Sequence, residues 1–187
     1  KMNSIDTSMP PTCPVHCLVR EVSDGFANCL REDPVAIDLE SARAQHQNYV
    51  DLLKSHVNQV TYVPCPEGHP DSVYIEDVAV ITGKHALVTR PGAPSRLSEI
   101  EGIEAALSQF CTVHTTQAPA SIDGGDVMRV GNHLIVGLSS RTNEAGFNRL
   151  KEIAQLDGLR CHAVPVHEGL HLKSAMTALD DKTVIYD

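Results

Sequence analysis

Residues 77–96 read DVAVITGKHALVTRPGAPSR, and residues 126–141 read DVMRVGNHLIVGLSSR. In both stretches an aspartate begins an apolar run, a turn with glycine follows, and a second apolar run leads into a polar loop that ends in arginine. Short apolar runs bounded by turn residues are typical of β-strands. The two stretches therefore predict two strand pairs of the same design.

The elements that follow each strand pair are also repeated. Helical periodicity covers about residues 98–110 after the first pair and residues 143–156 after the second. A further strand begins near Cys111 after the first helix and near Cys161 after the second. The two copies are offset by 49 residues. Two ββαβ units at one period predict an α/β repeat architecture.

Capping signals and a third helix complete this outline. Ser98 followed by Glu101 is a capping-box pattern, so the helix over residues 98–110 is predicted to start at Ser98. Another helix is predicted at about residues 38–56, between strands at 15–19 and 60–63. The sequence thus alternates strands and helices along its whole length.

A third copy of the strand pair begins near Ser174. It has a candidate strand at residues 175–179, a turn at Asp180-Asp181 and a strand at residues 183–186. We interpret this as a third unit that is cut short, so that about three units are present. The alternative is a natural C-terminal strand.

Composition restricts the classes of protein. Of 187 residues, 42% are hydrophobic and 21% are charged, which is typical of a soluble globular domain. No apolar run is long enough to cross a membrane, and no hydrophobic signal core is found near the N-terminus, so we expect a cytoplasmic protein. The net charge of −9 argues against a nucleic-acid partner. Scattered cysteines indicate reduced thiols, and the spacing of Cys13, His16 and Cys17 fits no standard zinc site.

Three acids mark residues 71–77, which read DSVYIED. If this segment is a strand, Asp71 and Asp77 face the same side, because their separation is even. Buried carboxylates are costly unless a cation meets them, and Glu76 adds a third negative charge. The segment indicates either a site for a guanidinium or ammonium group, or a solvated loop edge.

Three further segments hold candidate site residues. Arg96 and Arg141 end corresponding loops of the two units, which favours a converging pair of anion ligands over two unrelated surface arginines. The glycines in residues 122–126 permit a tight turn or a close approach to a ligand, although a capped loop is the simpler alternative. His171 lies between two leucines at an expected strand start, where a core histidine is more common than a catalyst.

Taken together, these segments resemble the dimethylarginine dimethylaminohydrolase family. The matching stretches are residues 71–77, 86–96 (ALVTRPGAPSR), 123–127 (DGGDV), 136–143 (VGLSSRTN) and 169–174 (GLHLKS). The resemblance implies the pentein fold, an α/β propeller of five ββαβ units. It also implies that residues 1–187 form a single catalytic domain whose C-terminal part is missing.

The resemblance assigns a role to eight residues. His171 matches the catalytic histidine and Asp123 its acidic partner. The residues that match substrate-binding positions are Arg96 and Arg141 for the α-carboxylate, Asp71 for the α-amino group, Glu76 and Asp77 for the guanidinium, and Phe26 for the lid, where the family usually has leucine. The family nucleophile is a cysteine near the C-terminus, and none of the six cysteines lies in its motif.

The implied activity is hydrolysis of asymmetric dimethylarginine and monomethylarginine to citrulline and dimethylamine or methylamine, a reaction of arginine metabolism and nitric oxide regulation. The resemblance implies no metal and no organic cofactor, and the chain as given would be inactive without the cysteine. The alternatives are an arginine deiminase, an amidinotransferase, or a relative that only binds guanidines. Because an incomplete ring would expose unpaired strands, we also expect contacts with another copy of the chain.

Overall fold

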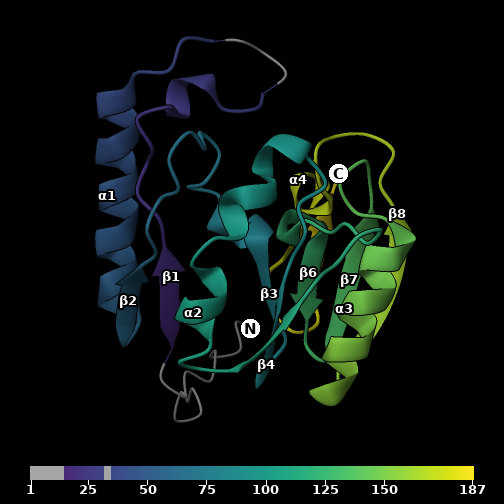
Figure 1. Ribbon diagram of the computed structural model, residues 1–187. Coiled ribbons are helices and arrows are strands. Elements are labelled where there is room, and N and C mark those ends of the chain that lie inside the picture. The colour runs from purple at the N-terminus through teal and green to yellow at the C-terminus, as the bar shows by residue number, and fades with distance from the viewer. Residues whose placement is uncertain (1–14, 32–34) are drawn as a thin grey trace, which may run out of the picture.

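The computed structural model describes residues 15–31 and 35–187, which form four small sheets with helices between them (Figure 1). Cys13, one of the three residues considered as zinc ligands, lies outside the described residues. The first sheet pairs β1 (His16–Val19) with β2 (Gln59–Tyr62) in parallel. Helix α1 (Leu39–His56) connects these two strands, and Figure 1 shows it on the outer side of this sheet.

The next two sheets have three strands each and the same strand order. One consists of β3 (Ala79–Ile81), β4 (His85–Val88) and β5 (Thr112–Thr115), and the other of β6 (Val127–Val130), β7 (His133–Leu138) and β8 (Arg160–Pro165). In both, the middle strand pairs antiparallel with the strand before it and parallel with the strand after it. The two predicted ββαβ units are therefore confirmed.

The last sheet is a hairpin of β9 (Met176–Ala178) and β10 (Val184–Tyr186), which confirms the predicted third strand pair. It follows the single-turn helix α4 (Leu172–Ala175). The strand pair repeats the start of the two preceding units. The number of units in a complete ring stays a prediction.

Two of the three predicted helices begin and end within one residue of the predicted bounds. Asp38 caps α1 by accepting the backbone N–H groups of Glu40 and Ser41. Asn143 caps α3 (Glu144–Leu156) by accepting the N–H of Gly146. Side-chain oxygens at these positions satisfy backbone donors that have no partner within the helix, so the caps explain why both starts were predictable.

The second helix differs from the prediction. Residues 94–100 form a 3₁₀ helix, η3 (Pro94–Ile100), and the α-helix α2 (Ile103–Leu107) begins only after Gly102, whose φ is 77°. The predicted start at Ser98 is wrong. A 3₁₀ helix stacks positions three residues apart, so Arg96 and Glu99 lie on one face and both are buried.

Residues 71–77 do not form the strand that was considered for them. The segment is a turn that leads into a short 3₁₀ helix, η2 (Ile75–Val78). Asp71 and Asp77 are nevertheless both buried, with exposed fractions of 4% and 7%. The even spacing therefore does not explain why the two carboxylates lie on the inside of the molecule.

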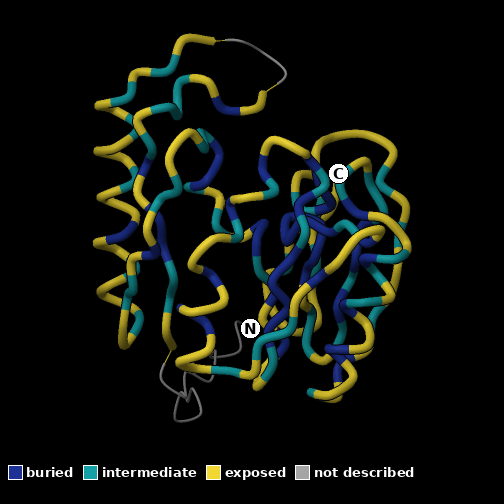
Figure 2. The backbone as a smooth tube through the Cα atoms, in the orientation of Figure 1, coloured by how far each residue is buried: buried dark blue, intermediate teal, exposed yellow. Residues whose placement is uncertain are grey.

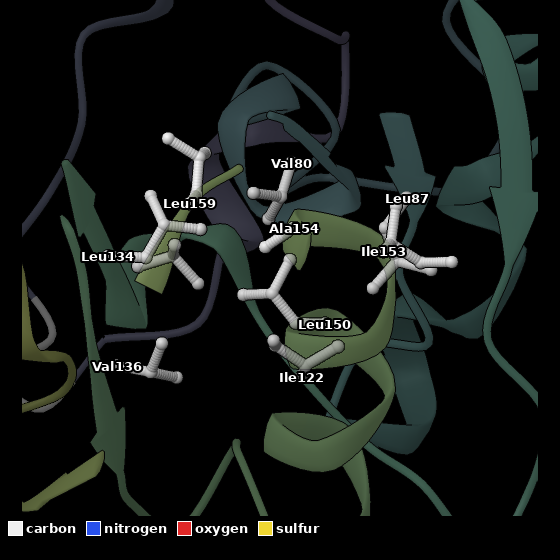
Figure 3. Packing of buried hydrophobic residues seen from close by; sticks show 10 residues of the cluster. Val80, Leu87, Ile122, Leu134, Val136, Leu150, Ile153, Ala154 and Leu159 are labelled. Carbon is white, nitrogen blue, oxygen red and sulfur yellow. The ribbon is translucent and has the colours of Figure 1, made fainter. Parts of the chain in front are cut away.

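Two apolar clusters form the core, and Figure 2 shows the buried residues concentrated where the sheets meet their helices. One cluster surrounds α3, which packs against β4 of the preceding unit as well as against β7 and β8 of its own. Leu150 of α3 is fully buried in this cluster, close to Ile122 and Ala154 (Figure 3). Helix α3 therefore joins two successive units through apolar contacts.

The described residues include no helix that is long and apolar enough to cross a membrane.

Replacing Leu150 with alanine should lower the free energy of unfolding by about 2–5 kcal/mol, because the side chain is fully buried and its removal leaves a cavity. The same change at Leu156, on the same helix and 59% exposed, should shift it by no more than about 0.5 kcal/mol. Urea unfolding followed by circular dichroism measures both. Equal losses would contradict the assignment of α3 as the central core helix.

Candidate active site

A cavity of about 370 Å³ lies where the second, third and fourth sheets meet. Its lining includes six of the eight residues that the sequence assigned to a site, namely Asp71, Glu76, Asp77, Arg96, Arg141 and His171. Asp123 lies beside the cavity next to His171. A larger cavity of about 630 Å³ lies between α1 and residues 21–25, and it contains none of these side chains.

Arg96 is the centre of a buried ion cluster on one wall of the cavity. Its Nη1 donates to Asp77 Oδ2 at 2.7 Å, and its Nε and Nη2 donate to Glu99 Oε2 at 3.0 and 2.7 Å. Nη2 also contacts the carbonyl oxygens of Asp71 and Tyr74. Burial disfavours the charged form, but the bonds to Glu99 and Asp77 outweigh it and raise the pKa of Arg96. Most donors of Arg96 are therefore occupied by protein groups.

Arg141 differs from Arg96 in this respect. Its backbone N–H donates to Ser139 Oγ at 3.0 Å, which fixes the loop after β7. Its half-buried guanidinium makes no hydrogen bond or ion pair with any residue that the structure describes. Arg141 is therefore the one of the two arginines whose donors can receive a ligand carboxylate.

His171 is 8% exposed and lies among three carboxylates. Its Nε2 is 3.8 Å from Asp77 Oδ1 and 3.9 Å from Asp123 Oδ2, while its Nδ1 is 3.6 Å from Asp126 Oδ2. Burial lowers the pKa of His171, but the three aspartates together raise it above its usual value. The residue is the N-cap of α4, rather than the expected strand start. The surroundings favour an imidazolium that can give up a proton to the cavity.

Asp123 is completely buried behind this histidine. Its Oδ1 accepts the backbone N–H of Gly92 at 2.7 Å, and its Oδ2 has no hydrogen-bond partner among the described residues. Burial raises the pKa of Asp123. An unpaired buried carboxylate oxygen is costly, so Oδ2 is a point at which a charged imidazole or a ligand donor would be stabilised.

A single cation could be held between Asp77, Asp123 and His171. One ligand atom from each of these buried residues lies within 4.8 Å of the others. Two carboxylates and an imidazole suit a divalent metal ion. The same two negative charges also suit a guanidinium, for which the resemblance had implied Glu76 and Asp77. The geometry alone allows either kind of cation.

The acid and amine at the entrance to the cavity are already paired. Glu76, whose side chain is 65% exposed, accepts from Lys173 Nζ at 2.6 Å, and Lys173 also donates to the carbonyl of Gly124 at 3.2 Å. Sequence reasoning missed Lys173, although it stands two residues after His171 in a quoted motif. Asp71, on the opposite wall, accepts the backbone N–H of Leu30 at 2.9 Å.

Phe26 is, with Asp123, one of the two predicted residues that the structure leaves outside the cavity lining. It begins the 3₁₀ helix η1 (Phe26–Asn28), and its ring centroid is 6.1 Å from that of Tyr74, which does line the cavity. Phe26 therefore supports the wall from behind in this structure, and its role as a lid residue stays a prediction.

Gly125 permits the close contact between His171 and Asp77. A Cβ atom at this position would lie 2.7 Å from the imidazole Cδ2 and 2.8 Å from Asp77 Oδ1. The backbone N–H of Gly125 donates to the same Oδ1 at 2.8 Å. The glycines of residues 122–126 were predicted to permit a turn or a close approach, and at Gly125 the close approach is to two site residues.

The comparisons with known proteins agree with this geometry. Residues 103–187 match the family described as Arginine deiminase. The chain is 43% identical over 150 residues to the dimethylarginine dimethylaminohydrolase of Streptomyces coelicolor, covering 80% of this chain and 58% of that protein. It is 34% identical over 168 residues to the enzyme of the same name from Pseudomonas aeruginosa, covering 89% of this chain and 65% of that protein.

The structural comparison points the same way. The structure of a cysteine-to-serine mutant of the Pseudomonas aeruginosa enzyme, complexed with citrulline, matches with a TM-score of 0.87 at 32% identity, covering 91% of this chain and 68% of that one. The match shows that the chain has the α/β fold of this hydrolase structure. The chain belongs to the dimethylarginine dimethylaminohydrolase family, in the pentein superfamily. It spans roughly three fifths of the length of the curated relatives it matches.

Replacing Arg96 with alanine should lower the free energy of unfolding by roughly 3–5 kcal/mol, because two buried carboxylates lose their cation. Replacing Arg141 with alanine should change it by no more than about 1 kcal/mol, because its guanidinium has no charged partner among the described residues. Thermal unfolding at one pH compares the two variants. A loss at Arg141 as large as that at Arg96 would contradict the different environments described above.

Proposed function

We propose that the protein to which this chain belongs hydrolyses methylated arginines, asymmetric dimethylarginine and monomethylarginine, to citrulline and the corresponding methylamine. The observation that carries this proposal is the buried histidine His171 between Asp77 and Asp123, in one cavity with the unoccupied guanidinium of Arg141. Relatives at 43% and 34% identity carry the name of this activity, and one of them is known in complex with citrulline.

The proposed substrate orientation follows from the distribution of charge. The guanidinium lies against Asp77, with Glu76 as a second acid. The α-carboxylate of the substrate lies on Arg141, whose side-chain donors have no partner among the described residues. Arg96 adds positive charge while it holds Asp77 in place. Asp71 accepts from the α-amino group. Opposite charges at the two ends of the cavity would align the substrate in one direction and fix its reacting carbon.

The proposed reaction has two stages. A cysteine thiolate attacks the guanidinium carbon, and His171 gives a proton to the departing dimethylamine as the carbon–nitrogen bond breaks. The neutral imidazole then takes a proton from water, which attacks the same carbon and releases the thiolate and citrulline. Asp123 stabilises the charged imidazole, as the acid of a catalytic triad does.

The cysteine of this mechanism has no counterpart at the family position within residues 1–187, so the proposal takes it from a longer form of the protein. The chain as given is proposed to bind but not to turn over its substrate. A single catalytic domain, a cytoplasmic location, pairing with another copy, and the absence of a metal or organic cofactor are part of the same proposal. So is a complete ring of five units.

A second candidate function is supported by the match of residues 103–187 to the Arginine deiminase family. A deiminase or an amidinotransferase would use the same histidine and carboxylates on a different guanidine, and a binding-only relative would use the cavity without chemistry. Comparing arginine, monomethylarginine and asymmetric dimethylarginine as substrates of the longer form separates these functions. Preference for unmethylated arginine would overturn the proposal in favour of a deiminase.

Arg141→Ala should weaken binding of citrulline to this chain by about tenfold or more, since a carboxylate loses a charged hydrogen-bonding partner. Isothermal titration calorimetry measures the affinity. Arg149→Ala is the matched control, because Arg149 pairs with Glu152 on α3 and does not line the cavity. Equal affinities of the Arg141 and Arg149 variants would remove Arg141 from the site.

His171→Ala in a form of the protein that contains the C-terminal cysteine should lower kcat for asymmetric dimethylarginine by a factor of about 10² to 10⁴, as loss of a general acid does. His167→Ala, at an exposed position four residues earlier, should leave kcat unchanged. Citrulline formation is the readout. Normal turnover by the His171 variant would refute the proposed mechanism.

A further inference from the structure

Asp126 is a buried carboxylate that the proposed mechanism does not use. It is completely buried, and its Oδ2 accepts hydrogen bonds from Ser139 Oγ at 2.6 Å and from Thr142 Oγ1 at 2.7 Å. Its Oδ1 accepts the backbone N–H of Leu172 at 3.0 Å. The Nδ1 of His171 lies 3.6 Å from Oδ2 and has no hydrogen-bond partner among the described residues. The unpaired nitrogen therefore faces this carboxylate.

The repeat shows that Asp126 occupies the same place in its unit as Asp77 does in the preceding one. Asp77 Oδ1 accepts the backbone N–H of Gly125, 48 residues further along, and Asp126 Oδ1 accepts that of Leu172, 46 residues further along. In both cases the aspartate side chain connects its own unit to the next. Both aspartates also contact His171.

The two aspartates differ in what neutralises them. Arg96 forms an ion pair with Asp77, whereas Asp126 receives two hydroxyl groups and has no arginine or lysine partner among the described residues. Hydroxyl donors stabilise a carboxylate without cancelling its charge. Among the residues that the structure describes, the negative charge of Asp126 is therefore directed at one group that can become cationic, the imidazole of His171.

The partners of Asp126 also tie three parts of the site together. Ser139 and Thr142 belong to the loop that carries Arg141, and the hydroxyl of Thr142 in turn accepts the backbone N–H of Asp123 at 3.1 Å. The bond to Leu172 fixes the residue directly after His171. One side chain thus holds the proposed carboxylate-binding loop and the proposed acid in a fixed relation.

We propose that Asp126 is a positioning residue of this site, which orients His171 through its Nδ1 and ties it to the loop of Arg141. This inference rests on the proposed function, in which His171 and Arg141 act on the substrate. Nδ1 carries a proton and points at Asp126, so that Nε2 faces Asp77, Asp123 and the cavity. Asp123 then stabilises the ring at the reacting nitrogen, Nε2, and Asp126 orients it from the other nitrogen, Nδ1.

The charges around His171 support this division. The carboxylates of Asp77, Asp123 and Asp126 face the ring. Three cations line the same cavity: Arg96 and Lys173 are paired with Asp77 and Glu76, and Arg141 has no charged partner among the described residues. Burial raises the pKa of Asp126, but the nearby imidazole of His171 and the hydrogen bonds from Ser139, Thr142 and Leu172 outweigh it and lower the pKa. Asp126 thus stays ionised over the range in which a histidine titrates.

The first test titrates His171 by NMR in the chain labelled at histidine. Asp126→Asn keeps the shape of the side chain and removes its charge, so the pKa of His171 should fall by about one unit or more. Asp157→Asn is the matched control. Asp157 also accepts from a threonine hydroxyl, backbone N–H groups and a histidine, but it stands at the far end of α3, about 20 Å from the start of that helix.

The Asp157 variant should leave the pKa of His171 unchanged, although it should lower stability. A pKa of His171 that is the same in the wild-type chain and in the Asp126 variant would overturn the proposal. Asp126→Glu, which restores the charge, should return the pKa toward the wild-type value. A purely structural role would not produce this pattern, because both asparagine variants remove a carboxylate that accepts several hydrogen bonds.

The second readout is citrulline affinity, which Asp126→Asn should weaken by about tenfold because the Arg141 loop loses its anchor. If the wild-type chain binds no citrulline, the proposed function fails, but the titration still decides the role of Asp126. If Asp126→Asn does not fold, the tautomer of neutral His171 in the wild-type chain decides. A proton on Nδ1 supports the proposal, and a proton on Nε2 overturns it.

Discussion

The pairing of Arg96 with Asp77 and Glu99 is the constraint on which the rest of the cavity depends. Three charged groups are buried together, and each is tolerable in the interior only because the others are present. Glu99 is held further by Arg20 of the segment after β1, which donates to its carbonyl oxygen at 2.6 Å. The cluster therefore links the first sheet to the wall of the cavity, and it sets the direction in which Asp77 faces His171. The 3₁₀ helix of residues 94–100 is compatible with this pairing, because it places Arg96 and Glu99 on one face.

The repeated unit provides the scaffold that brings these groups together. In each complete unit the first strand begins at the edge where the second strand ends, because the two are antiparallel. The loops after β4 and β7 carry Arg96 and Arg141 to that edge. Asp77 and Asp126 then connect each unit to the next through backbone N–H groups. A cavity lined by both carboxylates and arginines thus arises from two copies of one pattern that differ in a few side chains. The ion cluster of Arg96, Asp77 and Glu99 belongs to the first copy. The hydrogen bonds from Ser139 and Thr142 to Asp126 belong to the second.

Much of the fold was predictable from local signals, and most of the site was not. Short apolar runs predicted the strand pairs, and helical periodicity predicted α1 and α3, whose starts are capped by Asp38 and Asn143. The capping pattern at Ser98 was misleading, because residues 94–100 form a 3₁₀ helix in which Arg96 pairs with Asp77, 19 residues away. Six candidate residues do line one cavity, yet the occupied donors of Arg96 and the place of Asp126 depend on contacts between distant segments. The motif that contained Asp126 showed only the start of a strand.

The salt bridge between Glu76 and Lys173 has a consequence for how any positively charged molecule enters the cavity. Because Lys173 already neutralises Glu76, an arriving cation that reaches this acid must exchange with the ammonium group rather than add to an empty site. The local charge then changes little on entry, so this contact makes a small contribution to the ionic-strength dependence of uptake. The released lysine becomes a mobile donor at the rim, only two residues from the imidazole. Binding of a cation to Glu76 is thereby coupled, through residues 171–173, to the imidazole of His171.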